Sequence, residues 1–252
     1  MTDSTQRRND PPTRMPSLDT LAVAAAVLHL LAALGLLVAA PRLTTELPVR
    51  LSAPGLPPAP FAAVDLAAAA AVVLLVSAVV RLAVGIPPLR ERHAAALARG
   101  RAGVRWLELS QQAGITIVLV ALLNGVSEAG VLVAAYALAA GAVLLLLLQD
   151  RWVAPGRAGL APFSVGAAIG IVPWGVVALY QVTRLVVGEP VSLLVSATTL
   201  ALLALSAAQW WSVWWHRQPA RGEAAALGAE RVFLLLTLAH SAVLATAALL
   251  AG

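Results

Sequence analysis

The chain contains 252 residues, of which 60% are hydrophobic and only 12% are charged, and its mean hydropathy is +0.87. A soluble domain carries about 25% charged residues, so this composition excludes soluble, disordered and disulfide-rich secreted proteins and predicts a multi-pass protein of the cell membrane. The sequence has no Cys, and all 17 basic residues are Arg. Disulfides, thiolate metal sites and lysine Schiff bases are therefore excluded on this chain.

Seven stretches are long and apolar enough to span a bilayer, which takes about 20 residues per helix. They cover residues 18–40, 62–86, 104–126, 129–149, 162–186, 191–215 and 229–251. We therefore predict one all-α membrane domain, a seven-helix bundle over residues 18–252. Residues 1–17 are polar, with three Arg and three Pro, and are predicted to form a disordered cytoplasmic tail. The apolar stretch after them is too long for a signal peptide.

Arginines of the predicted connections gather on one side of the bundle. Thirteen of them lie in the tail and in the second, fourth and sixth connections: Arg7, Arg8, Arg14, Arg90, Arg92, Arg99, Arg101, Arg105, Arg151, Arg157, Arg217, Arg221 and Arg231. The other side has only Arg42, Arg50 and Arg184. The positive-inside rule therefore predicts a cytoplasmic N-terminus and an extracellular C-terminus, and the net charge of +5 gives no reason to expect a nucleic-acid partner.

Two connections are expected to have structure of their own. The first outer connection, residues 41–60, holds six Pro and predicts extended structure or a hairpin over the outer mouth. The inner connection Pro87–Gly103 fits either a short basic helix at the membrane surface or a solvated arginine-rich loop, and we favour the loop. Its segment Arg90–Arg101 is the expected surface for a cytoplasmic protein partner.

Two charged residues fall inside predicted spans. Glu108 lies about 6 Å and Arg81 about 8 Å from the cytoplasmic ends of their spans, at 1.5 Å per residue. Consecutive spans are usually neighbours, so an Arg81–Glu108 ion pair is one interpretation. The alternative is that each side chain extends separately to the headgroups.

Further polar residues lie deeper. His29 and His240 both come out about 16 Å deep, near the bilayer midplane, and Ser77 has a similar depth. Gln112 and Thr116 continue the helix face of Glu108 at i+4 and i+8. If the first and last helices touch, the two imidazoles face one polar chamber; the alternative is a set of unrelated interhelical hydrogen bonds. Two histidines without a carboxylate or thiolate at matching spacing do not predict a metal site.

The fifth and sixth spans carry aromatic residues beside helix-breaking or polar ones. Pro173 precedes Trp174 in mid-span and predicts a kink, and Gly166 and Gly170 allow a neighbour to approach closely. The sixth span ends in four Trp, a pattern typical of an interfacial belt. Gln209 precedes that cluster and is expected to face inward.

Three ordered motifs resemble the heliorhodopsin family. Arg105-Trp106-Leu107-Glu108-Leu109-Ser110 resembles the third-helix signature of that family. Pro162-Phe163, Gly166, Gly170, Pro173-Trp174 and Tyr180 resemble its fifth helix, and Glu230-Arg231-Val232-Phe233 with Thr237 resembles the start of its seventh, retinal-bearing helix. The long outer loop and the inverted topology also fit. The resemblance implies a rhodopsin-like fold and, by analogy, a homodimer.

The resemblance also implies roles for individual residues. Glu108 takes the counterion position, Ser77 lies near the Schiff base, and Trp174 and Gln209 line the pocket. Arg81 stands where the family often has a histidine. The retinal lysine falls on Ser241 if the helix is aligned without a gap from Thr237, or on His240 with a one-residue gap. Neither is Lys, so Arg81 is expected to replace the Schiff base as the cation facing Glu108.

Four functions follow in order of preference. The first is a sensor or regulator without a Schiff base, which binds a small apolar ligand such as a retinoid or carotenoid non-covalently, or binds nothing. The second is a structural membrane subunit, and the third is a proton or ion pathway through the polar residues. An enzyme is not expected, because no nucleophile–base pair or metal-ligand spacing is present.

Overall fold

The computed structural model describes residues 18–43, 45–99, 101, 103–152, 159–216 and 223–251. The predicted tail, with Arg7, Arg8 and Arg14, and the predicted loop residues Arg157, Arg217 and Arg221 lie outside these ranges. The elements, in chain order, are α1 (Leu18–Ala39), a 3₁₀ turn (Ala40–Arg42), β1 (Glu46–Leu51), β2 (Ala59–Asp65), α2 (Leu66–Gly85), α3 (Pro87–Ala98), α4 (Gly103–Leu123), α5 (Ala129–Trp152), α6 (Ala161–Gly170), α7 (Val172–Val186), α8 (Leu193–His216) and α9 (Glu223–Ala251).

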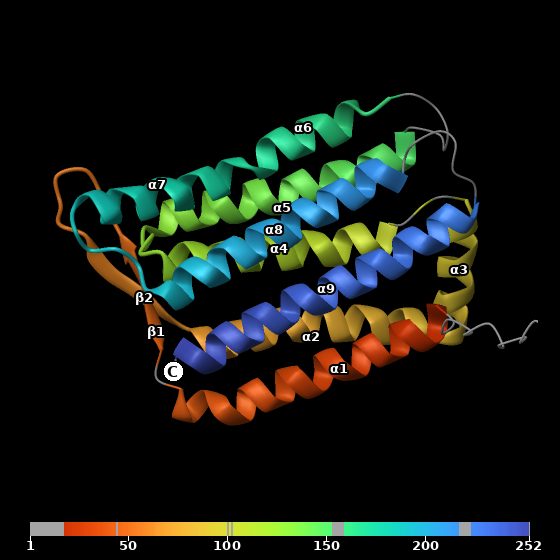
Figure 1. The fold of residues 1–252 in the computed structure, drawn as a ribbon, viewed down its shortest axis with the longest axis horizontal. Helices are drawn as coiled ribbons and strands as arrows, with labels where there is room; N and C mark the ends of the chain where they lie inside the picture. The colour runs from red at the N-terminus through yellow and green to blue at the C-terminus, as the bar shows by residue number, and fades with distance from the viewer. Residues whose placement is uncertain are drawn as a thin grey trace, which may run out of the picture.

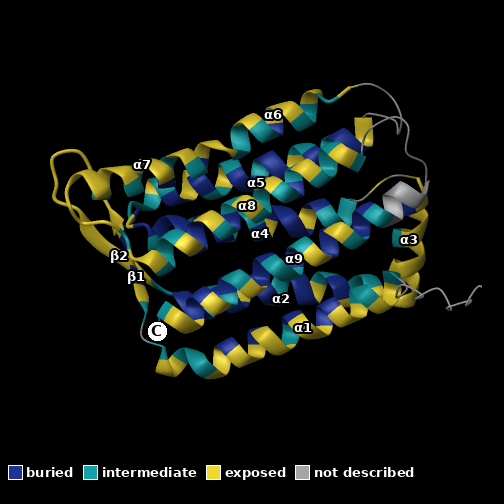
Figure 2. Ribbon diagram, viewed as in Figure 1, coloured by how far each residue is buried: buried dark blue, intermediate teal, exposed yellow. Residues whose placement is uncertain are grey.

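The described residues form an elongated helical bundle with seven helices long and apolar enough to cross a membrane, α6 and α7 counting as one (Figure 1). α9 lies against α1, α2 and α8, while α4 contacts α2, α5, α7 and α8. The predicted contact between the first and last spans is therefore confirmed. Figure 2 shows that buried residues follow the faces where helices meet, whereas the outer faces of α1, α6 and α7 are exposed. Exposed apolar side chains such as Val38, Val186 and Leu193 suit a lipid bilayer.

A two-stranded hairpin closes the end of the bundle where the described chain finishes (Figure 1). β1 pairs antiparallel with β2, with an irregularity between Val49 and Arg50. Leu47 and Val49 point into the apolar core, and the Ser52 hydroxyl donates to Glu128 Oε2 at 2.6 Å. The hairpin prediction is confirmed. The predicted start of the second span at residue 62 was wrong, because residues 59–65 form β2 and the helix begins only at Leu66. The Asp65 carboxylate caps α2 by accepting a hydrogen bond from Ala68 N–H.

The opposite end of the bundle carries α3, which runs across the helix ends (Figure 1). The favoured prediction of a solvated loop at Pro87–Gly103 was wrong, because residues 87–98 are helical. Two prolines at its start supply the fixed φ of a helix first turn, and Leu97 packs against Trp106 and Phe233 in a second core cluster. Most of its charged side chains remain exposed.

The fifth span is broken in the middle, as predicted. α6 ends at Gly170 and α7 begins at Val172, because Pro173 has no N–H to continue the helical hydrogen bonds. Gly166 packs closely on α5: a Cβ there would lie 2.8 Å from the Ala142 carbonyl oxygen and 2.9 Å from the Trp210 ring. The absence of a side chain at residue 166 therefore sets the distance between α6 and α5.

Candidate functional site

Arg81 and Glu108 form a buried ion pair between α2 and α4. Arg81 Nη2 lies 2.9 Å from Glu108 Oε1, and the two side chains are 5% and 3% exposed. Ser77 is buried one helical turn before Arg81 on the same face of α2. The ion-pair interpretation is confirmed, and separate extension to the headgroups is excluded because both side chains are buried.

A second ion pair lies beside the first. Arg105 Nε donates to Glu230 Oε2 at 2.8 Å, which joins α4 to α9. The Phe233 ring lies next to both cations, with its centroid 5.3 Å from the guanidinium carbon of Arg105 and 5.6 Å from that of Arg81. Cation–π contacts of this length stabilise guanidinium groups that have lost water. The sequence placed Arg105 among the loop arginines and in the third-helix motif, but it did not predict the pairing of Arg105 with Glu230.

A cavity of about 300 Å³ lies at the α3 end, between α1, α2, α3, α4 and α9. Both ion pairs line it, and most of its other lining residues are apolar. Ligand pockets for organic molecules begin at about this volume and combine apolar walls with a few polar groups. This cavity therefore has the size and chemistry of a small-molecule site.

His29 and Ser241 join α1 to α9. His29 Nε2 lies 3.0 Å from Ser241 Oγ, and its Nδ1 lies 2.7 Å from the Ala25 carbonyl oxygen. A carbonyl only accepts, so Nδ1 carries a proton, and in the neutral ring Nε2 accepts from the Ser241 hydroxyl. The hydroxyl of Thr237 is likewise bonded, to the Phe233 carbonyl in its own helix at 2.9 Å. The hydroxyl groups of Ser241 and Thr237 therefore both have hydrogen-bond partners inside the bundle.

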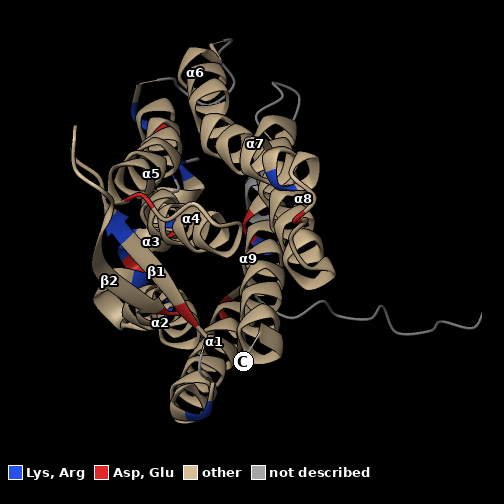
Figure 3. Ribbon diagram, turned by 90° about the vertical axis from the view of Figure 1, so that its left-hand side faces the viewer, with Lys and Arg blue, Asp and Glu red and all other residues tan. Residues whose placement is uncertain are grey.

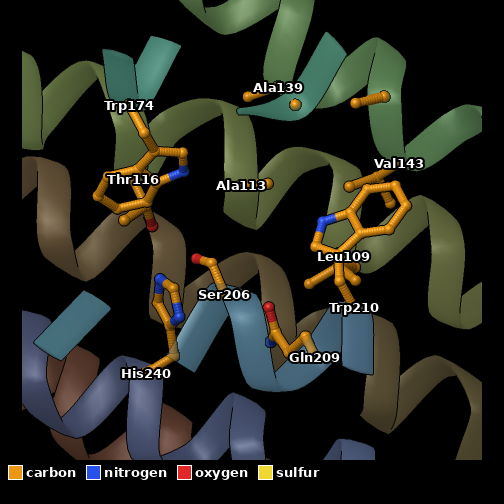
Figure 4. A pocket seen from close by; sticks show the side chains of 12 residues that line it. Leu109, Ala113, Thr116, Ala139, Val143, Trp174, Ser206, Gln209, Trp210 and His240 are labelled. Carbon is orange, nitrogen blue, oxygen red and sulfur yellow. The ribbon is translucent and has the colours of Figure 1, made fainter. Parts of the chain in front are cut away.

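His240 points away from His29, into a different space. It lines a cavity of about 40 Å³ together with Thr116, Trp174, Ser206 and Gln209. Figure 4 shows its imidazole directed towards Thr116 and Trp174, with the Ser206 hydroxyl alongside. The structure does not bring the two imidazoles into one chamber. Successive residues of a helix point about 100° apart, so Ser241 contacts His29 of α1 while its neighbour His240 points into the other cavity.

Several buried polar atoms near these two cavities have no hydrogen-bond partner among the described residues. They belong to Gln112, Thr116, Gln209 and His240. Glu108, Gln112 and Thr116 follow one another along one face of α4, as predicted, and are 3%, 1% and 1% exposed. Buried polar groups in native proteins bond to protein, water or ligand, so this stripe indicates a polar path between the two cavities.

The residues at the expected retinal attachment point do not fit a covalently bound retinal. Ser241 is bonded to His29, and His240 offers an imidazole rather than a primary amine. The cavity at His240 has a volume of about 40 Å³. Pockets for organic ligands are roughly 300 Å³ or larger.

Three further polar contacts were not predicted from the sequence. The Trp106 indole donates to Asp150 Oδ2 at 2.5 Å inside the bundle. At the hairpin end, Asn124 donates to Thr199 Oγ1 at 2.9 Å and accepts from Gln181 Nε2 at 2.8 Å. All three contacts join segments far apart in sequence, so no local pattern indicates them. Among the described residues no group of three metal-ligating side chains occurs.

Charged side chains divide between the two ends of the bundle. Of the described arginines, those at the α3 end are Arg90, Arg92, Arg99, Arg101, Arg105, Arg151 and Arg231. Figure 3 views the hairpin end, where Arg42, Arg50 and Arg184 lie. The chain path thus puts the arginine-rich connections at one end.

A sequence model of the heliorhodopsin family matches residues 18–251, which is nearly the whole chain. No curated protein matches it.

Proposed function

This chain belongs to the heliorhodopsin family, and on that premise we propose that it is a membrane sensor or regulator that binds a small, mainly apolar ligand without a covalent bond. The single observation that carries the proposal is the cavity of about 300 Å³ whose floor holds the Arg81–Glu108 pair. A retinal Schiff base has no lysine to form on in this chain. A retinoid, a carotenoid end group or another lipid held non-covalently remains compatible with the volume of this cavity.

The proposal includes the orientation of the chain. The arginine-rich α3 end faces the cytoplasm, by the positive-inside rule, and the hairpin faces outwards. This is the inverted topology expected from the sequence. The ligand cavity then opens near the cytoplasmic surface, directly under α3.

α3 is the element that connects ligand to partner. It forms one wall of the cavity through His93, Ala94 and Leu97, while Arg92 and Arg99 remain exposed on it. A ligand that packs against α3 changes the position or order of this helix, and a cytoplasmic protein bound at Arg90–Arg101 reads that change. The homodimer implied by the resemblance is a separate prediction, which light scattering of the purified protein tests.

An ion pathway has less support than a sensor. The hairpin half of the core is filled by apolar side chains, including Leu36, Leu66, Leu119 and Leu244. Asn124 lies in that half, and its side chain is bonded to protein partners at both ends. A structural subunit without ligand is the alternative that the following experiment separates from a sensor.

The test is mass spectrometry of small molecules that co-purify with the protein from its own host. We expect about one apolar molecule per chain, which added retinal displaces if it is a retinoid or carotenoid. Ala94→Trp fills the cavity and should abolish the co-purification. Ala95→Trp is the matched control, because Ala95 is the exposed neighbour on α3 that does not line the cavity. An empty wild-type protein, or equal contents in the two variants, would contradict ligand binding and favour the structural subunit.

A further inference from the structure

The cavity under α3 has one end that reaches the surface of the bundle. Its lining includes Val23 of α1, Gly85 of α2 and Arg90 of α3, and all three are exposed. Val23 belongs to a predicted span and is 56% exposed, so it lies where lipid contacts the bundle. A molecule can therefore enter from the membrane near the ends of α1 and α2.

The interior of the cavity suits one hydrocarbon chain. Leu18 and Ala22 of α1, Val80 and Val84 of α2, and Leu234 of α9 line it. Its volume of about 300 Å³ is at the lower end of the range for organic ligands. One chain fits this volume better than the two chains of an ordinary phospholipid.

The charges around the cavity favour an anionic head. Arg81 and Arg105 are each neutralised by a carboxylate, Glu108 and Glu230 respectively. Arg90 lines the mouth and forms no ion pair among the described residues, while the carboxylate of Asp19 is the opposing charge at the rim.

His93 lies next to this mouth and adds a polar ring. It also lines the cavity on α3 and is partly buried. An exposed guanidinium binds carboxylate and phosphate oxygens with paired donors, and a membrane headgroup region is where such heads lie.

We propose that the cavity under α3 binds a single-chain amphiphile with an anionic head, the chain lying between α1, α2 and α9 and the head bonded by Arg90 at the mouth. This inference rests on the proposed ligand-binding function and names its ligand class. A carboxylate and a monophosphate share the required chemistry, which identifies either a free fatty acid or a lysophospholipid as the source. The anionic head lies at the surface of α3, so ligand occupancy changes the charge that a cytoplasmic partner meets.

The experiment measures binding to the full chain in nanodiscs of neutral phosphatidylcholine. The probes are a fluorescent 16-carbon carboxylate, the matching alcohol, and a single-chain monophosphate used as competitor. We expect the carboxylate to bind about tenfold more tightly than the alcohol, because a charge-assisted hydrogen bond is lost in the alcohol. If the single-chain monophosphate displaces the fluorescent carboxylate and inorganic phosphate does not, the source is a lysophospholipid. If the single-chain monophosphate does not displace the fluorescent carboxylate, the source is a fatty acid.

Two pairs of variants locate the head and the chain. Arg90→Gln should remove the preference for the carboxylate, whereas Arg92→Gln, on the same helix but not lining the cavity, should keep it. Ala94→Trp should abolish binding of both probes and Ala95→Trp should not. Circular dichroism confirms that each variant keeps its helix content.

The two failures are distinguishable. If both probes bind equally and Ala94→Trp still blocks them, the anionic head is wrong while ligand binding in the cavity stands. Equal losses in Arg90→Gln and Arg92→Gln also overturn the inference, because they indicate general attraction to a basic surface. If neither probe binds, or if Ala94→Trp and Ala95→Trp behave alike, the proposed function itself fails.

Discussion

Arg81 on α2 and Glu108 on α4 contact each other at 2.9 Å inside the bundle, where less than a tenth of either side chain is exposed. A buried carboxylate without a cation is costly in a membrane protein. In this chain an arginine from the neighbouring helix supplies the charge that the resemblance assigns to a lysine-bound Schiff base. The bundle therefore holds a buried ion pair at the position that the resemblance gives to the Schiff-base counterion.

Breaking this pair should destabilise the bundle strongly. Arg81→Ala leaves Glu108 without its cation and should cost about 3–5 kcal/mol of unfolding free energy. Replacing both partners, as Arg81→Met with Glu108→Gln, should cost less than the single change, because no unpaired charge remains. Denaturant unfolding in mixed micelles measures both, with exposed Arg92→Ala as the control. A single variant as stable as wild type would show that the pair contributes nothing.

Retinal should not form a pigment with this protein. Added retinal is expected to leave no red-shifted visible band in the wild type, since the chain has no Lys. His240→Lys should also remain colourless, because the cavity of about 40 Å³ at His240 is too small for the polyene. Absorption spectra after incubation with retinal test this. A stable visible band in His240→Lys would show that the space between α4, α7 and α8 opens readily.

Gly166 should be intolerant of any side chain. Gly166→Ala places a methyl group 2.8 Å from a backbone oxygen of α5, so α6 must move away, at a cost of about 1–3 kcal/mol. Gly175→Ala is the matched control, because a Cβ there meets nothing within 4 Å, and it should be neutral or slightly stabilising. Thermal unfolding of the two variants distinguishes a packing effect from a general glycine effect.

The packing of α3 should weaken in mild acid. Burial lowers the pKa of His93, the nearby carboxylates of Glu230 and Asp19 oppose that shift, and Arg105 and Arg81 add to it. The folded state thus binds fewer protons than the unfolded state, so the contribution of His93 to stability is present at pH 7.5 and is lost as the pH falls below its ordinary value of about 6.5.

Hydrogen exchange of residues 87–98 at pH 7.5 and 5.5 measures this change. Relative to the intrinsic exchange rate at each pH, we expect lower protection at pH 5.5 in the wild type and a smaller difference in His93→Gln. An identical pH response in the two proteins would assign the effect to other groups.

Much of the architecture follows from the sequence alone. Long apolar stretches fix the number of spans, because a bilayer offers the backbone no hydrogen-bond partner and only a helix satisfies itself. Pro173 determines the break between α6 and α7, since the missing N–H is a local property. The absence of Lys by itself determines that retinal has no attachment point for a Schiff base on this chain.

Tertiary structure decided what the polar residues contact. The matching depths of Arg81 and Glu108 along their helices predicted that the two residues meet. The direction in which a side chain points around its helix, however, depends on how the helices pack. For that reason His29 bonds Ser241 while His240 faces Trp174 and Gln209. The cavity under α3 could not be predicted from the sequence either. Its walls come from five helices, and the favoured prediction for α3 was an arginine-rich loop. A cavity forms where side chains from segments distant in sequence leave a volume unfilled, and only the packing of the helices determines where this happens.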